Sequence, residues 1–275
     1  MGTLYVVATP IGNLEDITLR ALRVLGEVPL IAAEDTRTTR KLLSHHGIAA
    51  PKLVSYTERN RDQRTPGILA ALDGGDVALV SEAGMPGISD PGFHLVEAAI
   101  AAGHRVEPVP GASALVAAVA ASGLPARRFH YLGFLPRRAS ERRTALRAAA
   151  ALPDTLVVFE APHRLRASLA DMLATLGDRR IAVCRELTKL HEELYRGSVS
   201  EALAHFDAPR GEITLVIEGA GEAAPNAEPA IDVDSELRAL KAQGRRARDA
   251  VREIAARSGL PHRDVYARWL ALGDG

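Results

Sequence analysis

Cysteine and aromatic residues are scarce in this 275-residue chain, which contains one cysteine, one tryptophan and 4% aromatic residues. A single cysteine excludes a disulfide framework and a cysteine-based zinc site within one chain. Because Cys184 directly follows the apolar run Ile181–Val183, we expect a buried strand residue and not a nucleophile. With 47% hydrophobic residues, the composition is typical of an α/β protein rich in Ala, Val and Leu.

Long apolar runs and net charge are also absent. No segment reaches the roughly 18 continuous apolar residues of a membrane span. Residues 1–12 lack the basic region that opens a signal peptide, so we expect a cytoplasmic protein without a membrane partner. The formal net charge of zero argues against a uniformly basic nucleic-acid binder.

Common catalytic signatures are missing as well. The chain has no G-x-x-x-x-G-K-[ST] phosphate loop, no H-E-x-x-H zinc motif, no G-x-S-x-G elbow and no G-x-G-x-x-G dinucleotide motif. The nine histidines are dispersed, and nothing in the sequence requires a metal.

What the chain does contain is a pattern typical of a ligand crevice at Asp76–His94. Val77–Val80 are consecutive apolar residues, which favours a strand buried on both faces of a mostly parallel sheet. Glycines and prolines between positions 84 and 92 then prevent regular structure and let the backbone approach a bound molecule closely. In open α/β sheets, ligands bind beyond the carboxyl ends of the strands, where this loop would lie.

A second strand and loop of this kind follow at Arg105–Ser122. The strand RVEPV leads into Pro110–Ser113 and an alanine-rich helix, for which Ser113 is a plausible cap. The start of that helix offers free N–H donors to a ligand. Each loop by itself can equally be an ordinary βα turn, but the occurrence of two favours a crevice.

The alternation of apolar runs and breakers predicts two α/β domains followed by a helical segment. We expect an N-terminal α/β domain over 1–123 and a second over 124–221. An Ala/Pro/Glu-rich linker is expected over 222–234, and a helical segment over 235–275.

The helical segment has the spacing of a helix-turn-helix that contacts RNA. Three short helices are expected at Ser235–Ala242, Arg248–Arg257 and His262–Leu272. From Leu237 to Trp269 there are nine Arg or Lys residues against three acids, which suits a polyanion partner. The alternative is a plain helical hairpin that caps the second domain.

Two clusters of arginine are candidate RNA contacts. Arg245, Arg246 and Arg248 lie in the helical segment, and Arg137 and Arg138 lie in a basic run before a predicted helix. The basic run can also be a solvated helix face.

Seven motifs, collinear over nearly the whole chain, resemble those of the small-subunit ribosomal RNA methyltransferases of the tetrapyrrole (corrin/porphyrin) methylase superfamily. The motifs are Leu4–Asp16 (LYVVATPIGNLED), Ala33–Arg37 (AEDTR), Ser81–Val96 (SEAGMPGISDPGFHLV), Val109–Pro125 (VPGASALVAAVAASGLP), Phe159–Leu165 (FEAPHRL), Cys184–Gly197 (CRELTKLHEELYRG) and Gly211–Gly219 (GEITLVIEG). The chain departs from the family pattern where Asp-Ala-Gly-Thr-Pro is expected and Glu82–Pro86 (EAGMP) is found. A role for a threonine hydroxyl at position 85 is therefore lost.

The resemblance implies a class III methyltransferase fold, with S-adenosyl-L-methionine bound in a cleft between two α/β domains. Such a cofactor carries its own activation, and the protein mainly positions donor and acceptor. The implied acceptor is the ribose 2′-hydroxyl of a cytidine in the decoding region of small-subunit (16S) ribosomal RNA, free or in the 30S subunit, and the implied assembly is a homodimer. The implied cofactor contacts are Pro10, Ile11, Ser81, Gly84, Met85, Ile88, Gly111, Ala112, Ser113, Phe159 and Thr214.

A ribose hydroxyl is a poor nucleophile, so a positioned base or a cation should assist it. The candidates in the matched motifs are Asp35, Glu82, Glu160, His163, Glu186 and Lys189. Our hypothesis is that Asp35 or Glu186 is the carboxylate that orients the hydroxyl, with Lys189 or Arg37 as its electrostatic partner.

Two other functions remain open at this point. A tetrapyrrole-precursor C-methyltransferase would use the same two domains without needing the basic C-terminal segment. A non-enzymatic nucleic-acid-binding protein would use that segment and leave both crevice loops unexplained.

Overall fold

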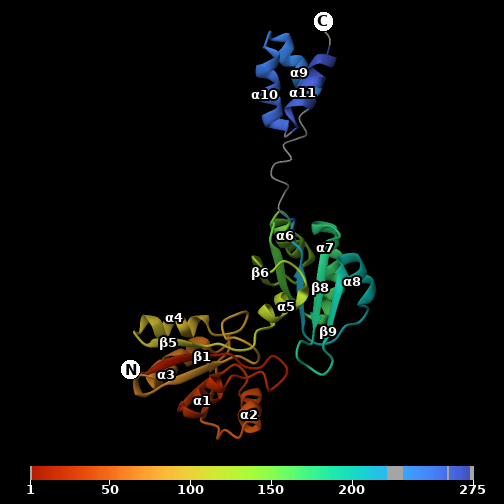
Figure 1. The fold of residues 1–275 in the computed structure, drawn as a ribbon. Coiled ribbons are helices and arrows are strands. Elements are labelled where there is room, and N and C mark those ends of the chain that lie inside the picture. Colours follow the sequence, from red (N-terminus) through yellow and green to blue (C-terminus); the bar gives the residue numbers. More distant parts are fainter. Residues whose placement is uncertain (1, 222–231, 259, 273–275) are drawn as a thin grey trace. The chain divides into compact units, whose positions relative to one another are not determined.

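The computed structural model describes residues 2–221, 232–258 and 260–272, and these form two compact units that divide at Gly221 (Figure 1). The larger unit contains two five-stranded sheets with helices, and the smaller unit contains three helices. The predicted α/β class with a helical C-terminal segment is confirmed. Within the described ranges, every helix is too short or too polar to serve as a bilayer span.

The first sheet is entirely parallel, with the strand order β3-β2-β4-β1-β5. Its strands are β1 (Thr3–Val7), β2 (Leu30–Ala33), β3 (Lys52–Ser55), β4 (Val77–Val80) and β5 (Arg105–Val109). Its helices are α1 (Leu19–Glu27), α2 (Thr36–His45), α3 (Arg61–Gly74) and α4 (Phe93–Ala101). Apolar side chains of α1 and α2 pack on one face of the sheet, and those of α3 and α4 pack on the other.

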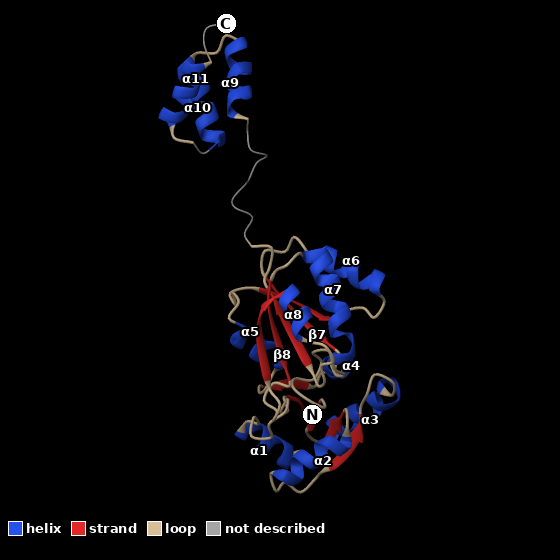
Figure 2. Cartoon of the chain, turned by 90° about the vertical axis from the view of Figure 1, so that its right-hand side faces the viewer, coloured by secondary structure: helices blue, strands red, loops and turns tan. Residues whose placement is uncertain are grey.

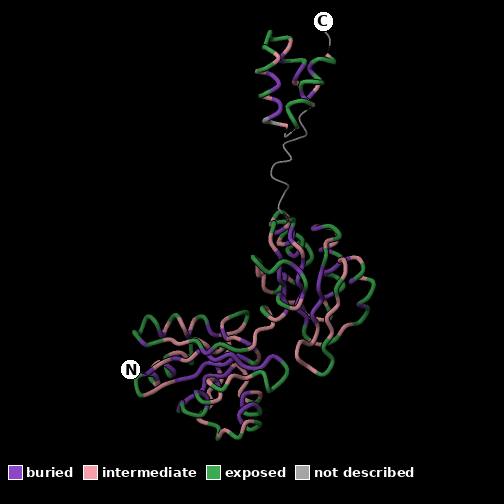
Figure 3. The backbone as a smooth tube through the Cα atoms, viewed as in Figure 1, coloured by how far each residue is buried: buried purple, intermediate pink, exposed green. Residues whose placement is uncertain are grey.

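Burial on both faces explains the composition of the central strands. All four residues of β2 and all four of β4 are buried, so each strand is a continuous apolar run (Figure 3). Polar side chains cap the starts of α1 and α2: the Thr18 hydroxyl accepts a hydrogen bond from the Ala21 N–H, and the Asp35 carboxylate accepts from the N–H groups of Arg37 and Thr38.

The second sheet is mixed, with the order β6-β7-β10-β8-β9, and only β6 and β7 are parallel neighbours. Its strands are β6 (Phe129–Phe134), β7 (Thr155–Glu160), β8 (Arg180–Arg185), β9 (Glu193–Ser198) and β10 (Ile213–Ile217). The helices between the strands of this sheet are α6 (Ala139–Ala149), the short 3₁₀ helix η1 (Pro162–Arg164), α7 (Leu165–Leu176) and α8 (Val199–His205). Apolar residues of α6, α7 and α8 cover one face of this sheet (Figure 2).

The opposite face of the second sheet is covered by α5 (Ala114–Ser122), which follows β5 of the first sheet. Ala118 and Val119 of α5 pack with Val157 and Val216 of the second sheet. Figure 1 shows α5 beside the strands of this sheet. The predicted N-terminal domain, 1–123, includes this helix. In the structure α5 packs on the second sheet, so the transition between the two sheets lies before α5.

Two further elements differ from the sequence expectations. The edge strand β9 and the helix α8 were not predicted, because their residues are largely polar or half-exposed. Cys184, in contrast, is a buried residue of β8 as predicted, and burial raises the pKa of its thiol to about 11.

The smaller unit has a hydrophobic core of its own. Its helices are α9 (Val233–Ala242), α10 (Ala247–Ser258) and α11 (His262–Ala271), which meet around Leu237, Ile254, Val265 and Trp269. Because α9 begins at Val233, the predicted linker 222–234 extends two residues too far, and its part 222–231 lies outside the described residues. The helix-turn-helix interpretation stays a prediction.

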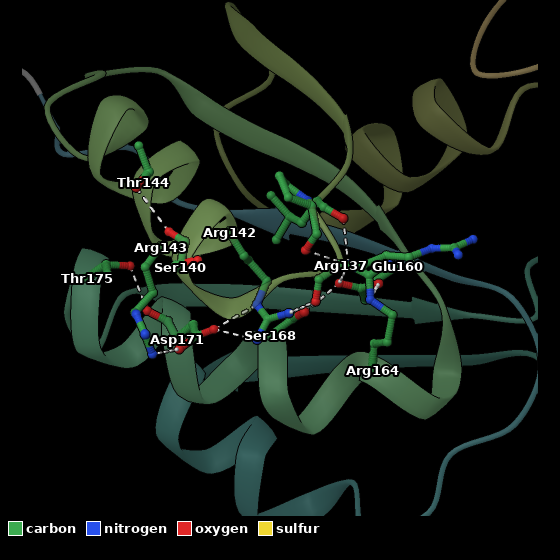
Figure 4. A network of polar contacts seen from close by, with 12 residues as sticks. Arg137, Ser140, Arg142, Arg143, Thr144, Glu160, Arg164, Ser168, Asp171 and Thr175 are labelled. Atoms are coloured by element: carbon green, nitrogen blue, oxygen red, sulfur yellow. Dashed lines mark hydrogen bonds and ion pairs between the residues drawn. The ribbon is translucent and has the colours of Figure 1, made fainter.

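A buried ion pair joins α6 to α7 (Figure 4). The Arg142 guanidinium donates from Nε to Asp171 Oδ2 at 2.7 Å, and Arg143 Nη1 lies 3.3 Å from Asp171 Oδ1. Arg142 also donates to the Arg137 carbonyl. The pair therefore anchors the loop in front of α6 as well as the two helices.

We expect Asp171→Ala to lower the free energy of unfolding by about 3–5 kcal/mol, because it leaves a buried guanidinium without its carboxylate. Asp207→Ala is the matched control, since the Asp207 side chain is 97% exposed and 3.8 Å from Arg166; it should change stability by less than about 0.5 kcal/mol. Urea unfolding of both variants measures the difference, and equal losses would contradict the role of the pair.

Candidate functional site

A cavity of about 360 Å³ lies in the larger unit, between residues that follow strands of both sheets. From the first sheet it is lined by Ile11 after β1, by the segment 83–90 after β4 and by residues 113–115 after β5. From the second sheet it is lined by Phe134, Phe159–Pro162 and Gly211–Thr214. The carboxyl ends of parallel strands β1, β4 and β5 therefore open into it, as expected for an α/β ligand site.

Most of the predicted cofactor contacts line this cavity. Those that do are Ile11, Gly84, Met85, Ile88, Ser113, Phe159 and Thr214. Pro10, Ser81, Gly111 and Ala112 are not in the lining, although they lie in the same loops; Pro10 and Ser81 are buried and Gly111 is exposed. The Ser81 hydroxyl is within hydrogen-bonding distance of the carbonyls of Ala83 and Gly84, so it shapes the loop that the cavity uses.

The loops after β1 and β4 are joined by two reciprocal main-chain hydrogen bonds. The Thr9 N–H donates to the Gly84 carbonyl at 2.9 Å, and the Gly84 N–H donates to the Thr9 carbonyl at 3.0 Å. Gly84 has φ +78°, a conformation that L-residues with a side chain rarely adopt. Glycine at 84 thus permits the bridge that forms this wall of the cavity.

Two non-glycine residues with positive φ connect the halves around the cavity. Ser89 (φ +65°) places its hydroxyl 2.5 Å from the Tyr131 hydroxyl of β6. Thr188 (φ +66°) accepts a hydrogen bond from the Asn13 N–H at 3.0 Å. A Cβ at Gly12 would overlap Lys189, so the backbones of these two loops lie in close contact. Strained residues of this kind gather where the surrounding structure holds a functional geometry.

Glu186, Lys189 and Glu212 form a compact charged group next to Gly211. Glu186 Oε1 accepts from Lys189 Nζ at 2.9 Å and from the Glu212 N–H at 2.8 Å, and Lys189 Nζ also lies 2.8 Å from Glu212 Oε2. Burial raises the pKa of Glu186, but these hydrogen bonds outweigh burial and hold the pKa below its usual value. The pKa of Lys189 is raised despite burial, since both carboxylates favour the ammonium. Of the three, only Glu212 lines the cavity.

Asp35 and Arg37 form a separate pair at the start of α2. Asp35 accepts from the Arg37 N–H at 2.7 Å and from Arg37 Nη2 at 2.8 Å. The hydrogen bond from the Arg37 side chain, followed by that from its N–H, lowers the pKa of Asp35 to about 2. Neither residue lines the cavity, and no hydrogen bond or ion pair in the described part of the chain joins this pair to Glu186 and Lys189.

The other candidate bases differ in their surroundings. Glu160 is buried, and its carboxylate accepts from the Ala161 N–H at 2.8 Å and from the Ser168 hydroxyl at 2.5 Å (Figure 4). Arg164 lies beside it and donates to the carbonyls of Leu135 and Pro136. Glu160 therefore fixes the loop beside the cavity, whereas His163 and Glu82 are exposed.

Sequence reasoning missed Asp90, which lines the cavity. Burial, together with the carboxylates of Glu34, Glu82 and Glu212, raises the pKa of Asp90 to about 7, against a hydrogen bond from Ser81 that lowers it. In the sequence Asp90 looked like an ordinary residue before a helix. The signal that could have identified it is an acid within the Gly/Pro loop itself.

The five arginines predicted to contact RNA are all exposed. Arg137 and Arg138 lie between β6 and α6. Arg245 and Arg246 lie at the turn between α9 and α10, and Arg248 lies in the first turn of α10. Arg138 pairs with Glu141 at 3.2 Å, and Arg245 pairs with Glu253 at 3.0 Å.

Comparison with known proteins gives close relatives over the full length. The family model for tetrapyrrole (corrin/porphyrin) methylases matches residues 3–203. A protein of Halalkalibacterium halodurans named ribosomal RNA small subunit methyltransferase I is 48% identical over 96% of this chain and 93% of its own. One of the same name from Synechocystis is 47% identical over 99% of both chains.

Solved structures share the fold. A uroporphyrin-III C-methyltransferase of Thermus thermophilus is 25% identical, with a TM-score of 0.56 over 80% of this chain and 95% of its own. A second structure of that name from Thermus thermophilus, complexed with S-adenosyl homocysteine, has 22% identity and a TM-score of 0.56 over 80% and 98%.

Gly211→Ala should destabilise the chain more than Gly177→Ala. Both glycines have positive φ (+86° and +82°), so both substitutions carry a conformational cost of about 1–2 kcal/mol. A Cβ at Gly211 would also overlap the Glu186 carboxyl and displace it from the Glu212 N–H, whereas nothing lies within 4 Å of a Cβ at Gly177. We expect a further loss of about 2 kcal/mol for Gly211→Ala in urea unfolding, and similar losses for the two variants would refute this contact.

Proposed function

The chain belongs to the tetrapyrrole (corrin/porphyrin) methylase family, and we propose on this basis that it is an S-adenosyl-L-methionine-dependent methyltransferase of small-subunit ribosomal RNA. The finer proposal is methylation of the 2′-hydroxyl of a cytidine in the decoding region. The observation that carries the proposal is 47–48% identity, over 96–99% of the chain, to proteins named ribosomal RNA small subunit methyltransferase I.

The residues around the cavity suit this cofactor. A volume of about 360 Å³ lies within the range of small-molecule sites, roughly 300–1,000 Å³. Ile11, Met85 and Ile88 provide apolar surface for an adenosine, and Asp90 and Glu212 provide negative charge for a cationic sulfur. The rings of Phe134 and Phe159 can contribute cation–π attraction.

S-adenosyl-L-methionine supplies a methyl group that is activated for transfer by a positively charged sulfur. The chain's own part is to bind and orient. Ser113 precedes α5 without making a side-chain cap, and the first N–H groups of this helix lie where they can meet a ligand. The Thr214 hydroxyl and the main chain near Gly84 add polar partners around the cavity.

We propose that the acceptor ribose is oriented by the candidate residues from the motifs, which the structure arranges as two ion pairs. Glu186 with Lys189 is supported by contact with Glu212 in the cavity wall. Asp35 with Arg37 follows β2, on the side of the first sheet where Glu34 accepts a hydrogen bond from the Glu82 N–H. Asp35 stays anionic above a pH of about 2, which suits orientation and electrostatic support better than proton transfer.

In this proposal, five arginines hold ribosomal RNA. Arg137 and Arg138 belong to the larger unit, and Arg245, Arg246 and Arg248 belong to the helical unit. All five guanidinium groups belong to exposed residues, as phosphate contacts require. From the same resemblance we propose a cytoplasmic homodimer.

Incubation of the purified chain with S-adenosyl-L-methionine and 30S subunits from a strain that lacks this gene should restore one 2′-O-methylcytidine. Mass spectrometry of nuclease digests locates it. Uroporphyrinogen-like substrates serve as the comparison, because the two solved structures compared above are uroporphyrin-III C-methyltransferases by name. If the chain methylates the tetrapyrrole and not the RNA, the function is C-methylation of a tetrapyrrole precursor. If the chain does not bind the cofactor, a non-enzymatic nucleic-acid-binding protein is favoured.

Arg246→Gln combined with Arg248→Gln should weaken RNA binding and its salt dependence. Each lost phosphate contact reduces the slope of log affinity against log salt by roughly 0.7–0.9, so we expect a decrease of about 1.4–1.8. Arg23→Gln is the control, because this exposed arginine pairs with Glu27 on α1. Filter binding to 30S RNA at 50–300 mM salt measures the slopes, and an unchanged slope in the double variant would exclude these contacts.

A further inference from the structure

The cavity carries negative side chains and no positive ones. Its described lining contains three carboxyl groups, on Asp90, Glu160 and Glu212, and no lysine, arginine or histidine. Such a lining favours a cation over a phosphate.

Asp90 differs from the other two carboxyl groups in its partners. Glu160 lies 3.3 Å from Arg164 Nε, and Glu212 lies 2.8 Å from Lys189 Nζ. For Asp90 the described part of the chain provides no ion pair, only a hydrogen bond from Ser81. It is the lining carboxyl whose charge is not fixed by a basic neighbour.

The groups that face Asp90 come from four different elements. Glu34 follows β2, Glu82 follows β4, Glu212 precedes β10, and Tyr131 of β6 also interacts with it electrostatically. Burial and the three glutamates disfavour a negative charge at Asp90, so the pKa of about 7 leaves this carboxyl group half protonated at neutral pH.

We propose that Asp90 accepts the proton of the acceptor hydroxyl, and that binding of the cationic methyl donor in the cavity converts Asp90 to the carboxylate that can do so. This rests on the proposed function, in which a sulfonium cofactor occupies the cavity. The hydroxyl oxygen forms a bond to the methyl carbon, the carbon–sulfur bond breaks with its electron pair on sulfur, and the hydroxyl proton passes to Asp90.

Charge then explains the return to the starting state. Before transfer, a positive sulfur beside Asp90 favours the carboxylate. After transfer the sulfur is neutral, and Asp90 carries the proton in surroundings that stabilise its neutral form. The proton leaves when the next cationic donor binds, so cofactor binding and proton release are linked.

Calorimetric titration tests this linkage without turnover. Between pH 5.5 and 8.5 the wild-type affinity for S-adenosyl-L-methionine should rise by up to about 30-fold, levelling off above pH 7, since the cation must expel a proton at the lower pH. Affinity for S-adenosyl homocysteine, whose sulfur is neutral, should change less than about threefold. Binding of the cation at pH 6.5 should release protons, seen as a dependence of the heat on buffer.

The Asp90→Asn variant distinguishes a chemical role of Asp90 from a structural one. The variant should bind S-adenosyl homocysteine like the wild type, bind S-adenosyl-L-methionine without pH dependence, and lose about 10²-fold or more in single-turnover methylation. Glu186→Gln should lower methylation but keep the pH dependence of binding. Asp62→Asn, at a side chain that is 96% exposed, should change neither.

The inference would be overturned if the wild-type affinity for S-adenosyl-L-methionine did not change with pH. It would also be overturned if Asp90→Asn kept both the pH dependence of this affinity and the methylation rate within threefold of the wild-type values. If the wild type shows the pH-linked binding but methylates no ribosomal RNA, the proposed substrate fails and the ionisation of Asp90 by the cofactor stands. If it methylates RNA and Asp90→Asn does so equally, only the role of Asp90 fails.

Discussion

The reciprocal hydrogen bonds between Thr9 and Gly84 are the contact on which the site depends. They fasten the loop after β1 to the loop after β4, two neighbouring strands of the first sheet. Without them, Ile11 and the segment from Ala83 to Asp90 would be independent loops with no fixed separation. β1 and β4 are interior strands of their sheet, and both contribute to its packed cores, so both loops begin from buried backbone.

The acidic residues in and near the cavity differ in how strongly their charged forms are stabilised. Asp35 and Glu186 are held in the charged form by Arg37 and Lys189, while Asp90 is left close to neutrality. Carboxyl groups of the same protein acquire different protonation behaviour through their partners. The protein therefore contains carboxylates whose charge is fixed by a basic neighbour and one carboxyl group, Asp90, whose charge is not.

Sequence patterns were sufficient for the elements that are buried on both faces. Val77–Val80 and Leu30–Ala33 are wholly apolar, and the strand at Val77–Val80 has the predicted bounds. The edge strand β9 was missed because Glu193–Ser198 is half-exposed and polar, so neither a continuous nor an alternating apolar pattern is present. Motif matching brought Ile11, Gly84 and Thr214 to one cavity. The raised pKa of Asp90, in contrast, comes from burial and from carboxylates in three separate segments of the chain, a combination that no local pattern records.

The crossing of α5 from one sheet to the other affects how the chain can be divided. Its residues Ala118 and Val119 belong to the core of the second sheet, and Arg196 of β9 donates to the carbonyls of Ala121 and Ser122 at its end. A fragment that stops at Gly123 would carry an apolar helix without the surface it packs on, and the remaining fragment would expose one face of its sheet. Two halves that reassemble would have to be separated before Ala114, and the cut would then fall in the wall of the cavity.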